Sequence, residues 1–320
     1  MFKWKKLGKI FDPSEVLNRP WIYEYAQAPT TLIFDDVVRI YFACRPPPDA
    51  SGNYVSLSAY AEFRRDNLTE LVRVCEKPML ELGQLGSFDE FGTYFTSVIR
   101  RENDVLAYYV GYTRCESVPF TIGIGAAISH DGGDSFTRIG SGPVLPCSVD
   151  EPFFLTVPRI REFNGQSYLW YSAGRRWLQT EKRAEPVYQI RMATSSDGVN
   201  WKKINRNLIE YKIDENECQA CPDVFEYKGR YHMFFCFRSS VNYYGKEGGY
   251  RLGYASSSDL VNWTRDDSKA GLDISENGWD SEMVSFPHVF ALDGDIYLLY
   301  LGNHIGRHGF GLAKLESHTD

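Results

Sequence analysis

The chain has 320 residues, an aromatic content of 15% and a net charge of −7, from 35 basic and 42 acidic residues. This balance, without any basic stripe, lacks the electrostatic footprint of a nucleic-acid-binding protein. No apolar run reaches the roughly 18 residues that a membrane-spanning helix needs, and the N-terminal MFKWKKLGKIF lacks the apolar stretch of a secretory signal.

The seven cysteines are an odd number in a chain without a secretory signal, which indicates reduced thiols and a cytoplasmic location. Cys218 and Cys221 form a C-x-x-C pair, but no second pair and no histidine pair lies near it. We interpret both as apolar structural thiols. The sequence therefore predicts no metal site and no cofactor.

The first predicted strand covers residues 2–11, FKWKKLGKIF. After it one motif recurs five times, with marker residues 68, 61, 64 and 65 positions apart. Each copy is followed by a polar turn and a second, aromatic strand, which is the pattern of a β-hairpin. The copies are AQAPTTLIF around Pro29, TYFTSVIR around Ser97, FLTVPRIR around Pro158, CQACPDVFE around Pro222 and VSFPHVFA around Pro287.

The repeats continue with a third strand, as in YQIRMATSSDG and YRLGYASSSDL, and then with an aromatic fourth strand. Four antiparallel strands in each of five such repeats predict an all-β, five-bladed β-propeller. The fifth repeat ends at its third strand, FGLAKLES, and residues 2–11 resemble the fourth-strand segment VNWKKINRNLIE. We therefore expect the N-terminal strand to complete blade 5 and close the ring of a single domain. The predicted blades cover residues 20–82, 88–147, 150–211, 214–268, and 279–316 together with 2–11.

These motifs resemble those of the five-bladed carbohydrate-active propellers, namely arabinanases and xylosidases, invertases and levansucrases, and mannoside phosphorylases. The resemblance rests on AQAP followed by RIYFACR, on GSFDEFGTYFTSVI, and on GWDSEMVSFPHVF with LGNHIGRHGFGLA. It is closer still to uncharacterised bacterial relatives found with polysaccharide-biosynthesis genes. A further motif, SHDGGDSF, fits the sialidase Asp-box, but sialidases have six blades. We interpret it as a structural turn between outer strands.

In a propeller the first strand of each blade lines the central channel, and its start shares a rim with the end of the second strand. Acidic or amide side chains stand at the predicted starts of the first strands, and arginines or an asparagine stand at the ends of the second strands. The first set is Glu24, Gln27, Asp89, Glu90, Asp150, Glu151, Glu217, Asp280 and Glu282. The second set is Arg45, Arg114, Arg175, Arg176, Arg238 and Asn303.

Glycoside cleavage needs two carboxyl groups, one protonated and one ionised, on either side of the bond, and crowding at a channel mouth can separate their pKa values. The resemblance implies one acid in each of the first three blades. Asp89 and Glu151 match in blades 2 and 3, whereas AQAP has no aspartate in blade 1. We expect Asp89, Glu151 and Asp280 to be catalytic.

The rim arginines predict an anionic ligand, because a guanidinium matches carboxylate and phosphate in bidentate fashion. The candidate binding residues are Glu24, Gln27, Arg45, Glu90, Tyr94, Arg159, Arg175, Glu217, Arg238, His288, Asn303 and His304. The predicted function is a glycoside hydrolase-like enzyme of bacterial surface polysaccharide metabolism, acting on a glycosidic bond of an anionic or nucleotide-linked sugar. A non-catalytic glycan-binding propeller and a phosphate-dependent phosphorylase remain alternatives, and the oligomeric state stays open.

Overall fold

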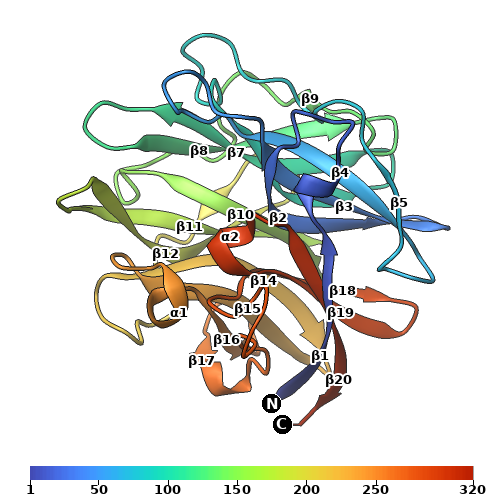
Figure 1. The fold of residues 1–320 in the computed structure, drawn as a ribbon. Coiled ribbons are helices and arrows are strands. Elements are labelled where there is room, and N and C mark those ends of the chain that lie inside the picture. Colours follow the sequence, from blue (N-terminus) through green and yellow to red (C-terminus); the bar gives the residue numbers. More distant parts are fainter. Residues whose placement is uncertain (320) are drawn as a thin grey trace.

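The computed structural model describes residues 1–319, which form twenty strands in five four-stranded antiparallel sheets (Figure 1). The innermost strands β2, β6, β10, β14 and β18 contact one another in a closed cycle. The sheets are therefore the five blades of a propeller, as the repeats predict. The only helical elements of residues 1–319 are single turns at Pro13–Glu15, Gly245–Gly248 (α1), Asp267–Lys269 and Asn303–Gly306 (α2).

The strands of each blade follow one another outward from the axis. Blade 1 consists of β2 (Glu24–Ile33), β3 (Val37–Arg45), β4 (Leu57–Arg64) and β5 (Leu71–Val74). Blade 2 consists of β6 (Thr93–Arg100), β7 (Val105–Arg114), β8 (Phe120–Ser129) and β9 (Thr137–Arg138). Blade 3 consists of β10 (Leu155–Phe163), β11 (Gln166–Gln179), β12 (Ala184–Ser195) and β13 (Lys202–Lys203). Blade 4 consists of β14 (Glu217–Tyr227), β15 (Arg230–Ser239), β16 (Arg251–Ser257) and β17 (Thr264–Arg265).

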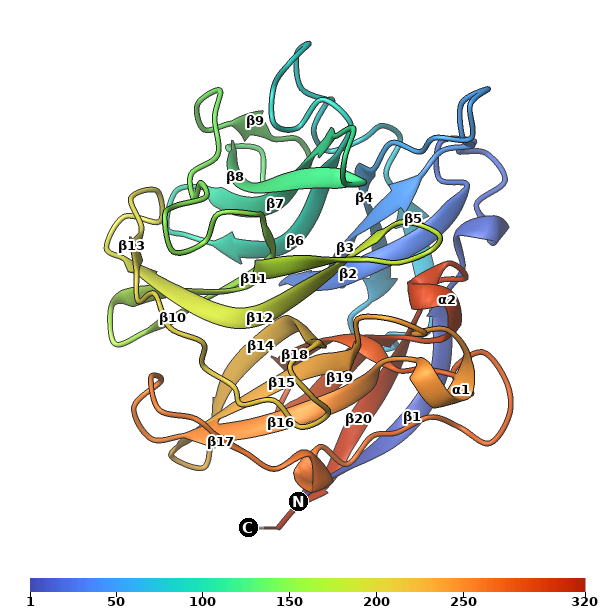
Figure 2. The same cartoon turned by 90° about the vertical axis from the view of Figure 1, so that its left-hand side faces the viewer.

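The ring closes as predicted, with both ends of the chain in blade 5. This blade consists of β18 (Ser285–Leu292), β19 (Asp295–Leu301), β20 (Phe310–His318) and, outermost, β1 (Phe2–Phe11). Strand β1 pairs antiparallel with β20, from Phe2 opposite His318 to Phe11 opposite Phe310. The two termini consequently lie side by side in both views (Figures 1 and 2).

The recurring proline motif marks a β-bulge in the innermost strands. The residue before the proline has a positive φ in four blades: Ala28, Val157, Cys221 and Phe286, with φ between 45° and 52°. The pairing with the second strand skips residues at the same places. Because bulges bend a strand and re-aim its side chains, the motif sets the shape of the channel wall.

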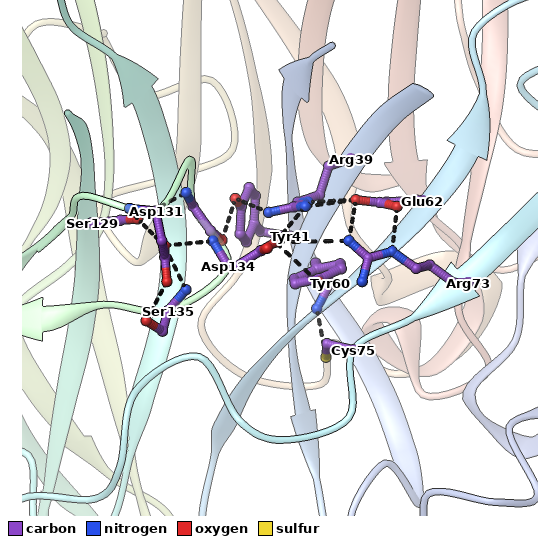
Figure 3. Close-up of polar contacts among 11 residues, drawn as sticks. Arg39, Tyr41, Tyr60, Glu62, Arg73, Cys75, Ser129, Asp131, Asp134 and Ser135 are labelled. Atoms are coloured by element: carbon purple, nitrogen blue, oxygen red, sulfur yellow. Dashed lines mark hydrogen bonds and ion pairs between the residues drawn. The ribbon is translucent and has the colours of Figure 1, made fainter. Parts of the chain in front are cut away.

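The Asp-box is a turn that fastens blade 2 to blade 1, which agrees with its interpretation as structural. The Ser129 hydroxyl donates to Asp131 at 2.6 Å and accepts the Gly133 amide at 2.8 Å. The Gly133 carbonyl in turn accepts the Tyr41 hydroxyl of blade 1 at 2.8 Å (Figure 3). Blade 3 repeats this contact, since the Gly198 carbonyl accepts the Tyr108 hydroxyl of blade 2 at 2.5 Å.

A partly buried ion cluster strengthens the same junction. The Arg39 guanidinium lies 2.6 Å from Glu62 of its own blade and 2.6 Å from Asp134 of the Asp-box turn (Figure 3). Arg73 also pairs with Glu62, at 2.6 Å. Two arginines thus face two carboxylates, so the cluster is balanced in charge and presents no surplus charge to a ligand.

Candidate functional site

One cavity of about 200 Å³ is lined by residues of all five blades, where the first strands begin. Larger, open hollows lie on the outer walls and are lined by one or two neighbouring blades each. The central cavity lies beside α1 and α2, because its lining includes Tyr243, just before α1, and Ile305 of α2. Both helical turns are to the right in Figure 2. Its aromatic lining comprises Tyr94, Tyr112, Phe120, Phe154, Tyr188, Tyr243, Tyr250 and Phe286. We call this cavity the central pocket.

Four of the predicted binding residues line the central pocket: Gln27, Arg45, Tyr94 and Arg238. Gln27 donates to the Ile305 carbonyl at 2.8 Å, which fixes the amide against α2. The Arg45 Nε, the Tyr94 hydroxyl and the Arg238 Nε are all buried without a hydrogen-bond partner. Since buried donors are normally paired, these three groups are donors at the pocket wall whose hydrogen-bonding capacity is unused within residues 1–319.

Arg238 is held by aromatic rings rather than by an acid. Its guanidinium lies 3.7 Å from the ring centre of Tyr243 and 5.1 Å from that of Tyr250. It also donates to the Tyr188 hydroxyl at 3.2 Å and to two backbone carbonyls. Only 6% of the residue is exposed, so the charge is buried with no carboxylate partner among residues 1–319.

Arg183 and Glu185 also line the pocket, and the sequence did not point to either. Both lie on the β11–β12 hairpin, which has the longest strands of the structure and reaches over the pocket to blade 4. Their side chains pair at 2.8 Å, and Arg183 donates to the Tyr243 hydroxyl at 2.8 Å. Glu185 is the one carboxylate among the pocket-lining residues of the described chain. No sequence motif marks it.

The three residues predicted to be catalytic do not line the central pocket. Each is buried in its own blade, where it accepts a hydrogen bond from a second-strand tyrosine and pairs with a cation from the outer strands. Asp89 contacts Tyr109 at 2.9 Å and Arg138 at 2.7 Å. Glu151 contacts Tyr171 at 2.9 Å and Lys203 at 2.6 Å, and Asp280 contacts Tyr300 at 3.1 Å and Lys6 at 2.7 Å.

This arrangement is a repeated tie between the inner and outer strands of a blade. Blade 4 has a version with Glu217, which pairs with Arg265 at 2.6 Å and accepts two backbone amides. Burial raises the pKa of Tyr109, Tyr171 and Tyr300 well above the usual range, so these phenols stay protonated and donate to the acids. The catalytic role of Asp89, Glu151 and Asp280 stays a prediction, and each would first have to leave an ion pair.

Five further predicted binding residues lie outside the lining of the central pocket. Glu24 pairs with Arg307 at 2.7 Å, and Arg175 donates to the Asp150 carbonyl at 2.9 Å. Asn303 accepts the Glu282 amide, Glu90 accepts the Gly86 amide, and His304 is exposed. None of these side chains lines the pocket.

Arg159 and His288 lie in the channel between the first strands. The Arg159 guanidinium donates to the Thr96 and Pro29 carbonyls, so it joins three blades. His288 accepts the Thr31 amide at 3.1 Å and lies 3.1 Å from Asp223, whose other oxygen is 2.6 Å from Arg161. Burial lowers the pKa of His288 to about 4. The adjacent Asp223 carboxylate raises this pKa, whereas the positive charges of Arg159 and Arg161 lower it further.

Within residues 1–319, no cluster of three or more histidine, cysteine or acidic side chains is placed to hold a metal ion. All seven cysteines are free. No helix of this part of the chain is long and apolar enough to cross a membrane.

Comparison with known proteins adds relatives in sequence and in fold. No family model matches the chain. It is 33% identical over 317 residues to "Uncharacterized protein Rv1502" and to "Uncharacterized protein MT1551", from two strains of Mycobacterium tuberculosis, covering 98% of this chain and 99% of each relative. The chain belongs to the family of these mycobacterial proteins.

This chain shares its fold with solved structures of glycoside hydrolases. It superimposes on a protein described as "Glycoside hydrolase" with a TM-score of 0.76 and 18% identity, covering 98% of this chain and 92% of the other. A thermostable family-43 glycoside hydrolase gives 0.65 and 15%, with 92% and 94% covered. The family-32 β-fructofuranosidase of Bombyx mori gives 0.62 and 15%, with 93% and 63% covered. The expected fold resemblance is therefore confirmed.

Proposed function

We propose that the central pocket binds a carbohydrate that carries an anionic group. The observation that supports this most directly is the set of buried donors without acceptors at Arg45, Tyr94 and Arg238. The pocket residues include three arginines and one glutamate, so the lining is positively charged. The aromatic walls suit the apolar face of a sugar ring, and a few convergent polar groups would fix its orientation.

The size of the pocket limits how much of the ligand it encloses. Its volume of about 200 Å³ is smaller than the ~300–1,000 Å³ of common ligand sites. One sugar unit is therefore the part of the ligand that becomes buried, and the rest of a longer glycan would leave through the mouth. We place this glycan in bacterial surface polysaccharide metabolism, which is supported by the sequence resemblance, and a nucleotide-linked sugar remains an alternative ligand.

The test compares sugars that differ only in charge. Binding of glucose and glucuronate, galactose and galacturonate, and mannose and mannuronate is measured by calorimetry with wild type and the Arg238→Lys variant. We expect the acid of at least one pair to bind more tightly and Arg238→Lys to weaken it about 5- to 100-fold, because the charge remains while the bidentate geometry is lost. Equal affinity within every pair and no effect of the variant would contradict the proposal.

A second candidate function is cleavage of the bound sugar, and one observation favours phosphorolysis over hydrolysis. Hydrolysis uses two carboxyl groups, whereas the pocket lining holds Glu185 alone. In phosphorolysis phosphate replaces the second group as it attacks the anomeric carbon, and the carboxyl group protonates the leaving oxygen. Incubating glycans with and without phosphate distinguishes the outcomes, because sugar 1-phosphate forms only in phosphorolysis. A Glu185→Gln variant that retains full turnover would remove Glu185 from the reaction.

A further inference from the structure

Arg45 and Arg238 occupy separate walls of the central pocket. Arg45 ends β3 in blade 1 and Arg238 lies near the end of β15 in blade 4. Between these two blades, Phe286 and Ile305 of blade 5 form the pocket wall. The two arginines share no hydrogen-bond partner and no aromatic neighbour.

Each of these arginines has an acid close by that already belongs to another arginine. Glu24 lies directly opposite Arg45 in the pairing of β2 and β3, yet its carboxylate pairs with Arg307 at 2.7 Å. Near Arg238, Glu185 reaches the Tyr243 hydroxyl at 3.4 Å but pairs with Arg183 at 2.8 Å. Within residues 1–319, neither Arg45 nor Arg238 therefore forms an ion pair.

Aromatic rings lie against both guanidinium groups. Arg45 lies 4.3 Å from the ring centre of Tyr25 and 5.4 Å from that of Tyr54. Arg238 is enclosed by Tyr188, Tyr243 and Tyr250. In each case the buried Nε–H has no partner. A guanidinium whose faces are covered by rings binds through the N–H groups in its plane, which match the oxygens of a carboxylate or phosphate.

We infer that the central pocket holds two oxyanions at once, one at Arg45 and one at Arg238. The inference rests on the proposed function and narrows it, since the ligand is then a sugar with two acidic groups or an acidic sugar bound together with a free anion. A single anion at one wall would leave the arginine of the other wall without a counter-charge, and for the buried Arg238 this is costly.

Inorganic phosphate is the probe for the test. Thermal unfolding is followed in rising phosphate, against chloride at equal ionic strength, for wild type, Arg45→Gln, Arg238→Gln and the double variant. Two independent sites add their stabilisation, so each single variant should keep part of the wild-type shift, the two parts should sum to the whole, and the double variant should show none. Arg64→Gln, which changes an exposed arginine of β4 outside the pocket, should keep the full shift.

Loss of the entire shift in either single variant would show one shared anion and overturn the inference. A wild-type shift no larger than that of the double variant would overturn it as well. If Arg238→Gln does not fold, Arg238→Lys replaces it, and the expected result is a higher half-saturating phosphate concentration. If the phosphate assay shows one shared anion and the sugar-binding test still shows a preference for acidic sugars, only this inference is contradicted. If the sugar-binding test shows no such preference, the proposed function is contradicted.

The same assay distinguishes the two sources of the anions. Glucuronic acid 1-phosphate that removes the phosphate response of both single variants places both anions on one sugar. If glucuronate removes the phosphate response of only one of the two single variants, Arg45→Gln or Arg238→Gln, the second anion is bound separately from the sugar.

Discussion

Replacing Asp89 with asparagine separates a structural from a catalytic role of this residue. The Asp89 side chain is 1% exposed and accepts Ser87, Tyr109 and Arg138 at 2.8, 2.9 and 2.7 Å. The amide would present a donor where an oxygen now accepts two of these bonds. Losing a charge-assisted bond of about 1.5–3 kcal/mol and a neutral one of about 1 kcal/mol, less what water recovers at the partly exposed Arg138, predicts a destabilisation of about 2–3 kcal/mol.

Urea unfolding monitored by circular dichroism measures this change, and binding of the preferred sugar is measured on the same preparations. Asp273→Asn is the matched control, because the Asp273 side chain is 75% exposed and comes no closer than 3.5 Å to an arginine. We expect Asp89→Asn to unfold at a lower urea concentration with sugar binding retained, and the control to match wild type. Unchanged stability together with lost turnover would refute the structural reasoning and make Asp89 catalytic.

Three further changes test the ring and its channel. Deleting residues 1–12 removes the outer strand of blade 5 and should strongly lower the melting temperature; an unchanged value would mean that β1 does not close the ring. His288 has a folded pKa of about 4, so the unfolded state binds a proton between pH 6.5 and pH 4 that the native state does not. Unfolding free energy should therefore fall as the pH drops through this window, by up to about 3 kcal/mol, and a His288→Gln variant whose profile is equally steep would contradict this assignment. Tyr41→Phe removes the bond to Gly133 and should cost about 1 kcal/mol in urea unfolding, whereas the exposed Tyr23→Phe should cost nothing; equal values would show that the bond does not hold the blades together.

The fold was predictable because the same pattern of strands and turns occurs in five successive repeats. Strand order within a repeat is local, and the missing fourth strand of blade 5 has a counterpart only in residues 2–11. Position along a strand also assigns a side chain to a rim, and three residues assigned in this way, Gln27, Arg45 and Arg238, line the central pocket.

The partners of the acids could not be predicted in the same way. Asp89 is 49 residues away from Arg138 in sequence, and the tie to the outer strand forms only when the blade is assembled. Glu185 was missed because the extent of the β11–β12 hairpin is set by strand pairing up to Gln179 and Ala184 rather than by a motif. The sequence thus assigns several pocket-lining side chains to one rim of the ring. Contacts between residues distant in sequence determine which charged side chains at this rim form ion pairs.

The closure of blade 5 affects the order in which the strands can pair while the chain is being synthesised. Strand β1 is synthesised before every other strand of the ring, whereas its partner β20 is synthesised after all of them. Phe2 and Trp4, which are buried in the finished ring, must remain solvent-exposed or transiently covered throughout translation. Because contacts between distant parts of a chain form slowly, the final docking of this strand should limit the rate of folding. A circular permutant that starts at the β19–β20 loop and joins Thr319 to Met1, whose backbones are 3.0 Å apart at a hydrogen bond, would make β20 and β1 neighbours in sequence and should fold faster.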